Sequence, residues 1–184
     1  MIDGGLRRGE VCGLGVDDLL FSSNGIRVRH SAVYVPGQGV IVGEPKTESS
    51  SRVVIVMPLT MEIARNYLRW REEAGHFPDS PLLFTSRNGG PLNPDTINSW
   101  MEKFCRKNGF SAEYTPKALR HTFATLQVAG GVDIKTLQSR TGHSRPSTLT
   151  NTYAHLLRGK QGAAAGILES ALTANLPKDC PEEQ

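Results

Sequence analysis

A change of residue pattern at Pro58 divides the chain into two kinds of structure. Between Gly25 and Pro58, short runs of β-branched and aromatic residues alternate with glycine and proline, which is typical of antiparallel strands joined by turns. After Pro58, apolar residues recur at helical spacing. We therefore expect an α+β fold that is mainly α-helical, with a small antiparallel β-sheet of about three strands near its N-terminal third.

Capping signals predict where several helices begin and end. Asn93-Pro94 and Thr115-Pro116 each place a capping side chain before a proline in the first helical position. They predict helices to about residues 108 and 129, and Asp133 is expected to cap a third helix that reaches Thr141. The other expected helices cover residues 6–14, 58–75, 146–157 and 161–174.

Composition limits the class of protein without identifying it. The 184 residues suffice for one domain with a sizeable core. A net charge of +3 permits a nucleic-acid partner without requiring one. No apolar run is long enough to cross a membrane, so we expect no membrane partner. Cys12, Cys105 and Cys180 have no metal-ligand spacing, and free thiols in a reducing cytosol are expected.

Residues suited to phosphate chemistry occur in separate segments whose order matters more than any one of them. These segments are Gly5-Leu6-Arg7-Arg8-Gly9-Glu10-Val11, Pro45-Lys46-Thr47, Thr115 to Thr125, Thr141-Gly142-His143-Ser144 and Thr152-Tyr153-Ala154-His155-Leu156. Arg120 and His143 are 23 residues apart, and His143 and Tyr153 are 10 apart. Each segment alone is a weak signal, whereas their common order and spacing form a strong one.

Together these segments resemble the signature boxes of the tyrosine recombinases of the phage-integrase type, over roughly residues 4–157. The resemblance implies a fold like the catalytic domain of that family and a DNA strand-transfer enzyme. The positions that match the family's catalytic residues are Arg7, Lys46, Lys117, Arg120, His143 and Tyr153.

Lys117 departs from the family pattern. The second box usually reads His-x-x-Arg-His-Thr-Phe-Ala-Thr, and here it begins Lys117-Ala118-Leu119-Arg120. A lysine donates hydrogen bonds to a phosphate, but it does not act as a base at neutral pH as imidazole does. Lys117 is therefore expected to bind phosphate rather than to accept a proton.

The chemistry of strand cleavage explains these residue types. Attack by Tyr153 forms a phosphotyrosyl ester that keeps the bond energy for rejoining. A free phenol has a pKa of about 10, so it must lose its proton during attack or be activated by nearby cations. The guanidinium groups of Arg7 and Arg120 suit the negative charge of the transition state. Lys46 is expected to protonate the departing 5′-oxygen, and His143 to bind the phosphate or assist Tyr153.

Two further expectations concern the surroundings of this chemistry. Glu10 lies one helical turn after Arg7 and is expected either to hold that arginine in place in the site or to form an ordinary salt bridge with it. The sequence contains no cluster of metal ligands and no GxxxxGK[ST] loop, so we expect a reaction without metal or nucleotide cofactor.

The resemblance also implies partners and a location. Double-stranded DNA is the expected substrate, bound by a homotetramer in which the helix at residues 161–174 docks onto a neighbouring protomer; alternatively, that helix packs on its own domain. The expected location is the bacterial cytoplasm, at the nucleoid, and the expected role is site-specific recombination, by integration or excision, of a mobile element such as a phage or transposon. A non-catalytic DNA-binding remnant is one alternative, and a topoisomerase or Xer-like resolvase of chromosome dimers is another.

Family members normally carry further helices before the first box and an N-terminal DNA-clamping domain. We therefore expect residues 1–176 to be a catalytic domain that lacks both, followed by a flexible tail at residues 177–184. In that case Leu6, Val11 and Leu14 should form an exposed apolar patch.

Overall fold

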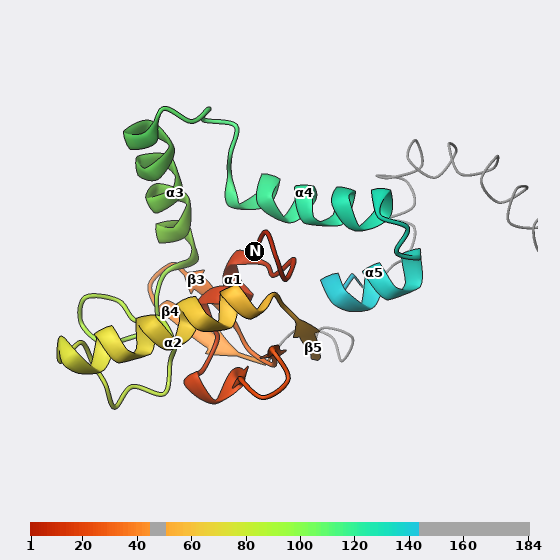
Figure 1. The fold of residues 1–184 in the computed structure, drawn as a ribbon. Coiled ribbons are helices and arrows are strands. Elements are labelled where there is room, and N and C mark those ends of the chain that lie inside the picture. The colour runs from red at the N-terminus through yellow and green to blue at the C-terminus, as the bar shows by residue number, and fades with distance from the viewer. Residues whose placement is uncertain (45–50, 144–184) are drawn as a thin grey trace, which may run out of the picture.

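The computed structural model describes residues 1–44 and 51–143. Figure 1 shows α2 (Pro58–Glu73) and the strands on one side of the molecule, and α4 (Pro116–Ala129) with α5 (Ile134–Thr141) on the other. The N-terminal segment and α1 (Arg8–Cys12) lie between the two sides. This mixture of helices with small antiparallel sheets confirms the α+β prediction. The helices expected at 146–157 and 161–174, and the tail, lie outside the described residues.

The three capping predictions are confirmed. The Asn93 side chain accepts a hydrogen bond from the Asp95 amide at 3.0 Å at the start of α3 (Pro94–Asn108). Thr115 caps α4 and Asp133 caps α5 in the same way. Because a capping oxygen satisfies an amide that has no partner within the helix, these short sequence signals fix helix starts reliably.

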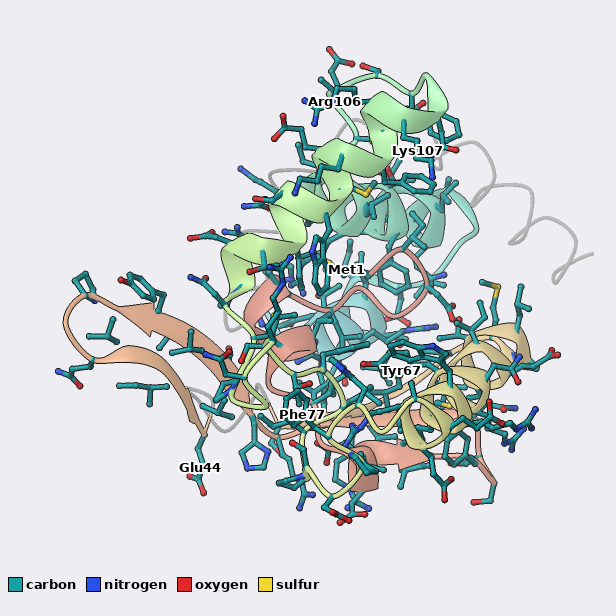
Figure 2. The ribbon with its side chains drawn as sticks, turned by 90° about the vertical axis from the view of Figure 1, so that its left-hand side faces the viewer. Met1, Glu44, Tyr67, Phe77, Arg106 and Lys107 are labelled. Atoms are coloured by element: carbon teal, nitrogen blue, oxygen red, sulfur yellow. The ribbon has the colours of Figure 1, made fainter. Side chains whose placement is uncertain are left out.

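The strands form two sheets instead of the single sheet expected. The strands β1 (Leu19–Leu20), β2 (Gly25–Val28) and β5 (Arg52–Ile55) form an antiparallel sheet in the order β1-β2-β5. The strands β3 (Ser31–Val35) and β4 (Gly39–Gly43) pair only with each other among the described strands. Figure 2 shows their hairpin extending outward from the body. The single-sheet prediction is wrong because pattern alone identifies strands but not their pairing.

The first helix is shorter than residues 6–14. Arg7 has an extended backbone as the N-cap, and Gly13 ends the helix after Cys12. A Cβ atom on Gly9 would lie 2.6 Å from the Ala32 carbonyl oxygen, and one on Gly13 would lie 2.9 Å from the Ser31 amide nitrogen. Gly13 thus ends the helix, and both glycines let it pack directly against the backbone of β3.

The expected exposed patch at Leu6, Val11 and Leu14 is wrong. Leu6 and Leu14 are only 2% and 4% exposed. They belong to the main core, where Val54 of β5 and Met61 of α2 are also buried, and Val11 packs against that core. Burial follows because α2 and the sheet close over these side chains, which then line an apolar cavity. A second, smaller core joins α4 to α5.

Within the parts of the chain that the structure describes, no helix has the length and apolar character needed to cross a membrane.

Arg71 fixes the loop that follows α2. Its side chain is buried, and its guanidinium donates hydrogen bonds at 2.6–3.2 Å to the carbonyl oxygens of a single loop segment. The acceptors belong to Phe77, Pro78, Ser80, Leu82 and Leu83. An apolar side chain in this place would leave several carbonyl groups without a donor.

We expect Arg71→Met to lower the free energy of unfolding by about 3 kcal/mol, because unsatisfied buried acceptors carry a large desolvation cost. Arg69→Met is the matched control, since Arg69 is exposed on the same helix. Urea denaturation of both variants measures the difference. Equal stabilities would show that water replaces the guanidinium without cost.

Candidate active site

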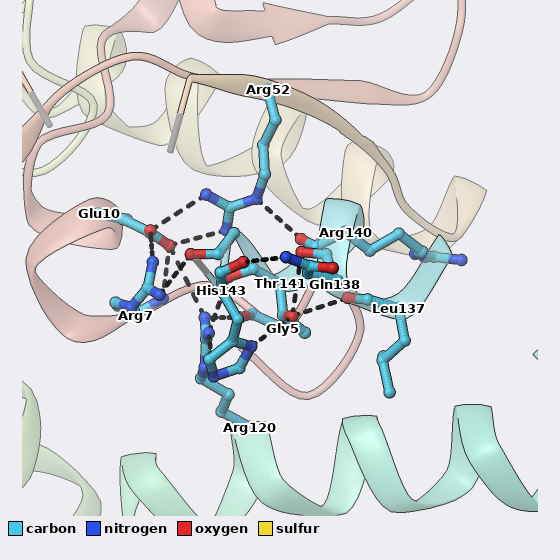
Figure 3. A network of polar contacts seen from close by, with 11 residues as sticks. Gly5, Arg7, Glu10, Arg52, Arg120, Leu137, Gln138, Arg140, Thr141 and His143 are labelled. Atoms are coloured by element: carbon cyan, nitrogen blue, oxygen red, sulfur yellow. Dashed lines mark hydrogen bonds and ion pairs between the residues drawn. The ribbon is translucent and has the colours of Figure 1, made fainter. Parts of the chain in front are cut away.

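Three arginines converge on the carboxylate of Glu10 (Figure 3). Arg7 donates to it from the guanidinium and from the backbone amide, both at 2.7 Å. Arg52 forms a two-pronged pair with it at 3.1 and 3.0 Å. Arg120 reaches it from α4 at 4.0 Å. One negative charge therefore organises three positive charges that come from the start of α1, from β5 and from α4.

Glu10 is charged although it is buried. Burial acts to raise the pKa of its carboxyl, but hydrogen bonds and charge from Arg52 and Arg7 outweigh this and hold the pKa below its usual value. Only 3% of the Glu10 side chain and 5% of the Arg52 side chain are exposed. The pair is thus a buried and fully ionised support of the site.

The same three arginines also bind the C-terminal end of α5. Arg52 donates to the carbonyl oxygen of Arg140 at 2.8 Å, Arg120 to that of Thr141 at 2.7 Å, and Arg7 to that of Gly142 at 2.6 Å. Helix C-terminal carbonyls have no partners within the helix and carry partial negative charge, so guanidinium groups stabilise them. These contacts hold α5, and the residue that follows it, against the Glu10 cluster.

Gly142 turns the backbone so that the next residue, His143, lies beside the Glu10 cluster. It ends α5 in the left-handed conformation, with φ of 65°. This conformation turns the chain at the helix end and favours glycine. The Nε2 atom of His143 then lies 3.4 Å from Arg120 Nη2, and its Nδ1 atom lies 2.7 Å from the Thr141 hydroxyl.

His143 is neutral in this setting. Burial and the positive charges of Arg120, Arg7 and Arg52 lower the pKa of its imidazole from 6.5 to about 4, against a weaker opposite effect of Glu10. The three arginines and Glu10 together leave an excess of positive charge. This arrangement is suited to binding an anion with two or more oxygens, such as a phosphodiester.

The structure brings four of the expected site residues together: Arg7, Glu10, Arg120 and His143. The expected contact between Glu10 and Arg7 is confirmed. Lys117 is exposed on the first turn of α4, one turn before Arg120 on the same helix. Lys46 and Tyr153 lie outside the described residues, so their places in the site stay predictions.

Arg52 is the member of the cluster that sequence reasoning missed. The signal available was a lone arginine at the start of an apolar strand, six residues after Lys46. A charged residue there looks like a strand-edge residue in solvent, yet its side chain is buried against Glu10. Within residues 1–44 and 51–143, no group of three or more His, Cys, Asp or Glu side chains is placed to hold a metal ion.

Comparison with known proteins identifies the family. The model of the phage integrase family matches residues 1–159. The chain therefore belongs to the phage integrase family.

Individual relatives agree with this assignment. The chain is 33% identical over 152 residues to the tyrosine recombinase XerC of Chlamydia caviae, covering 83% of this chain and 43% of that protein. It is 35% identical over 175 residues to the tyrosine recombinase XerA of Pyrococcus furiosus, covering 94% of this chain and 51% of that protein. The chain thus spans about half the length of these curated relatives.

Solved structures show the same fold. The integrase of transposon Tn1549, solved as residues 82–397 with circular intermediate DNA, superposes with a TM-score of 0.75 at 26% identity, over 92% of this chain and 57% of that one. A crystal structure of XerA recombinase gives a TM-score of 0.65 at 28% identity, over 96% of this chain and 56% of that one.

Proposed function

We propose that this chain is the catalytic domain of a site-specific recombinase that cleaves and rejoins DNA through a covalent 3′-phosphotyrosyl intermediate at Tyr153. The observation that carries the proposal is the cluster of Arg7, Arg120 and His143 around one buried carboxylate. These residues come from separate boxes of the family signature, and the fold unites them.

In the proposed reaction, Arg7 and Arg120 bind the non-bridging oxygens of the scissile phosphate, and their charge stabilises the transition state. The phenolic oxygen of Tyr153 loses its proton and bonds to phosphorus, the bond from phosphorus to the 5′-oxygen breaks, and Lys46 protonates that oxygen. Lys117, exposed one turn before Arg120, adds a hydrogen bond to the same phosphate.

Double-stranded DNA is the proposed substrate, and the similar integrase of transposon Tn1549 is described in complex with circular intermediate DNA. The proposed assembly is a homotetramer on two duplexes, with residues 161–174 docking onto a neighbouring protomer. Its place of action is the bacterial cytoplasm, at the nucleoid. Integration or excision of a mobile element is the favoured role, and the Xer-named relatives support resolution of chromosome dimers as the second candidate.

A trapping experiment tests the nucleophile. The chain and its Tyr153→Phe variant are incubated with nicked duplexes made from the ends of the genetic element that encodes the chain, and from the chromosomal resolution site of its host. We expect the unaltered chain to form a protein–DNA adduct that survives SDS, and the variant to form none, because phenylalanine has no hydroxyl to attack phosphorus.

The outcomes of this trapping experiment separate the candidate functions. Adducts with both proteins would show that another residue is the nucleophile. Binding without any adduct, repeated with the full gene product, would favour a DNA-binding remnant. The duplex that traps the protein distinguishes element integration from chromosome-dimer resolution.

A further inference from the structure

The hydrogen bonds around His143 determine which of its ring nitrogens carries the proton. Thr141 is completely buried, and its hydroxyl oxygen lies 2.7 Å from the carbonyl oxygen of Leu137. Two oxygens at this distance need a proton between them, and only the hydroxyl has one to give. The Thr141 hydroxyl therefore donates to Leu137 and is left as an acceptor toward His143.

The Nδ1 atom of His143 lies 2.7 Å from that acceptor oxygen, so Nδ1 carries the ring proton. The other ring nitrogen leads to the same result independently. Nε2 lies 3.4 Å from Nη2 of Arg120, and a guanidinium nitrogen only donates. Nε2 therefore carries a lone pair, which faces Arg120 in the structure, and both contacts agree on a neutral Nδ1–H imidazole.

We propose that Thr141 holds His143 as the Nδ1–H tautomer, so that Nε2 is the proton acceptor for the nucleophile of the strand-cleavage reaction. This inference rests on the proposed function. It gives the base role to His143, because Lys117 occupies the position where the family usually has histidine. In the step, the hydroxyl proton of Tyr153 passes to Nε2, the phenolic oxygen bonds to phosphorus, and the bond from phosphorus to the 5′-oxygen breaks. Lys46 protonates that oxygen.

The surrounding charges fit a base that is strengthened by the substrate. Arg120, Arg7 and Arg52 face the ring and disfavour its protonated form when no DNA is bound, while Glu10 acts weakly in the opposite sense. A scissile phosphate adds negative charge between these arginines and the ring, which raises the proton affinity of Nε2. Thr141 is a positioning residue in this scheme, since it acts through His143.

The tautomer is measured directly in the 15N-labelled chain by long-range proton–nitrogen NMR correlations of the imidazole rings at neutral pH. His143→Gln assigns the His143 signals. We expect the 15N chemical shift of Nε2 to be that of an unprotonated ring nitrogen, and the 15N chemical shift of Nδ1 to be that of a protonated one. Thr141→Val, of the same shape without the hydroxyl, should move His143 toward the Nε2–H form, and Thr141→Ser should retain the original form. An Nε2–H ring in the unaltered chain, or no change in Thr141→Val, overturns the assignment.

The acceptor role is tested in the trapping assay as a single-turnover rate across pH. General-base catalysis contributes roughly 10²–10⁴-fold, so misplacing the acceptor should slow cleavage by Thr141→Val about 10- to 100-fold and alter its pH profile. Thr141→Ser should cleave nearly as fast as the unaltered chain. Unchanged cleavage despite an altered tautomer overturns the acceptor role. Absence of any Tyr153 adduct overturns the proposed function instead, and leaves the tautomer result standing.

Discussion

Replacing Glu10 with glutamine is expected to lower the free energy of unfolding by about 3–5 kcal/mol at neutral pH, because removing one partner of a buried ion pair leaves the other charge uncompensated. Arg52 is almost fully buried, and it loses its counter-charge and one of its two acceptor oxygens, while Arg7 and Arg120 lose the same counter-charge. The loss should appear as a lower urea midpoint at an unchanged slope.

Glu102→Gln is the matched control. Glu102 pairs with Arg106 on the surface of α3 at 3.9 Å, and its side chain is 71% exposed. An exposed ion pair contributes only about 0–1 kcal/mol, so this variant should unfold nearly as the unaltered chain does. Similar losses in both variants would show that burial does not set the strength of the Glu10 pairs.

Acidification should remove the difference between Glu10→Gln and the unaltered chain. The pKa of Glu10 in the folded protein is below its usual value of 4.5. Its charge therefore stabilises the fold above that value, and the contribution is lost as pH falls from about 4.5 through the folded pKa. The two unfolding curves should approach each other in this range. A constant difference at every pH would mean that the substitution acts through altered packing instead of lost charge.

Arg120→Lys is expected to reduce single-turnover cleavage roughly 100- to 1,000-fold, the usual effect of removing a donor that stabilises transition-state charge. The variant keeps the positive charge but loses the planar fork. In the structure that fork binds the carbonyl oxygens of Gly5 and Thr141 and approaches His143. Trapping rates on a nicked duplex, together with binding to the same duplex, measure the effect.

Binding to DNA should change much less than cleavage, because contacts to other phosphates supply most of the affinity. Arg69→Lys, an exposed exchange on α2, is the control and should cleave at the normal rate. Parallel losses of binding and cleavage in Arg120→Lys would assign Arg120 to ground-state affinity alone.

The starts of three helices were predictable from the sequence, because the residues that cap a helix lie next to the turn that they cap. Asn93, Thr115 and Asp133 begin their helices as expected, since a cap acts within three residues of itself. Strand pairing was not predictable, because β2 pairs with β5 across the β3–β4 hairpin and the intervening residues. The burial of Leu6 and Leu14 likewise depends on α2, which is distant in sequence.

The order and spacing of the segments that hold Arg7, Lys46, Arg120, His143 and Tyr153 indicated the family and the class of chemistry, because catalysis on a phosphodiester requires side chains of these types. Only the tertiary structure revealed Arg52, whose partner Glu10 is 42 residues away. It likewise revealed that three guanidinium groups bind three successive carbonyls at the end of α5. The contact between Arg120 and His143 likewise depends on the tertiary structure, because Arg120 belongs to α4 and His143 follows α5.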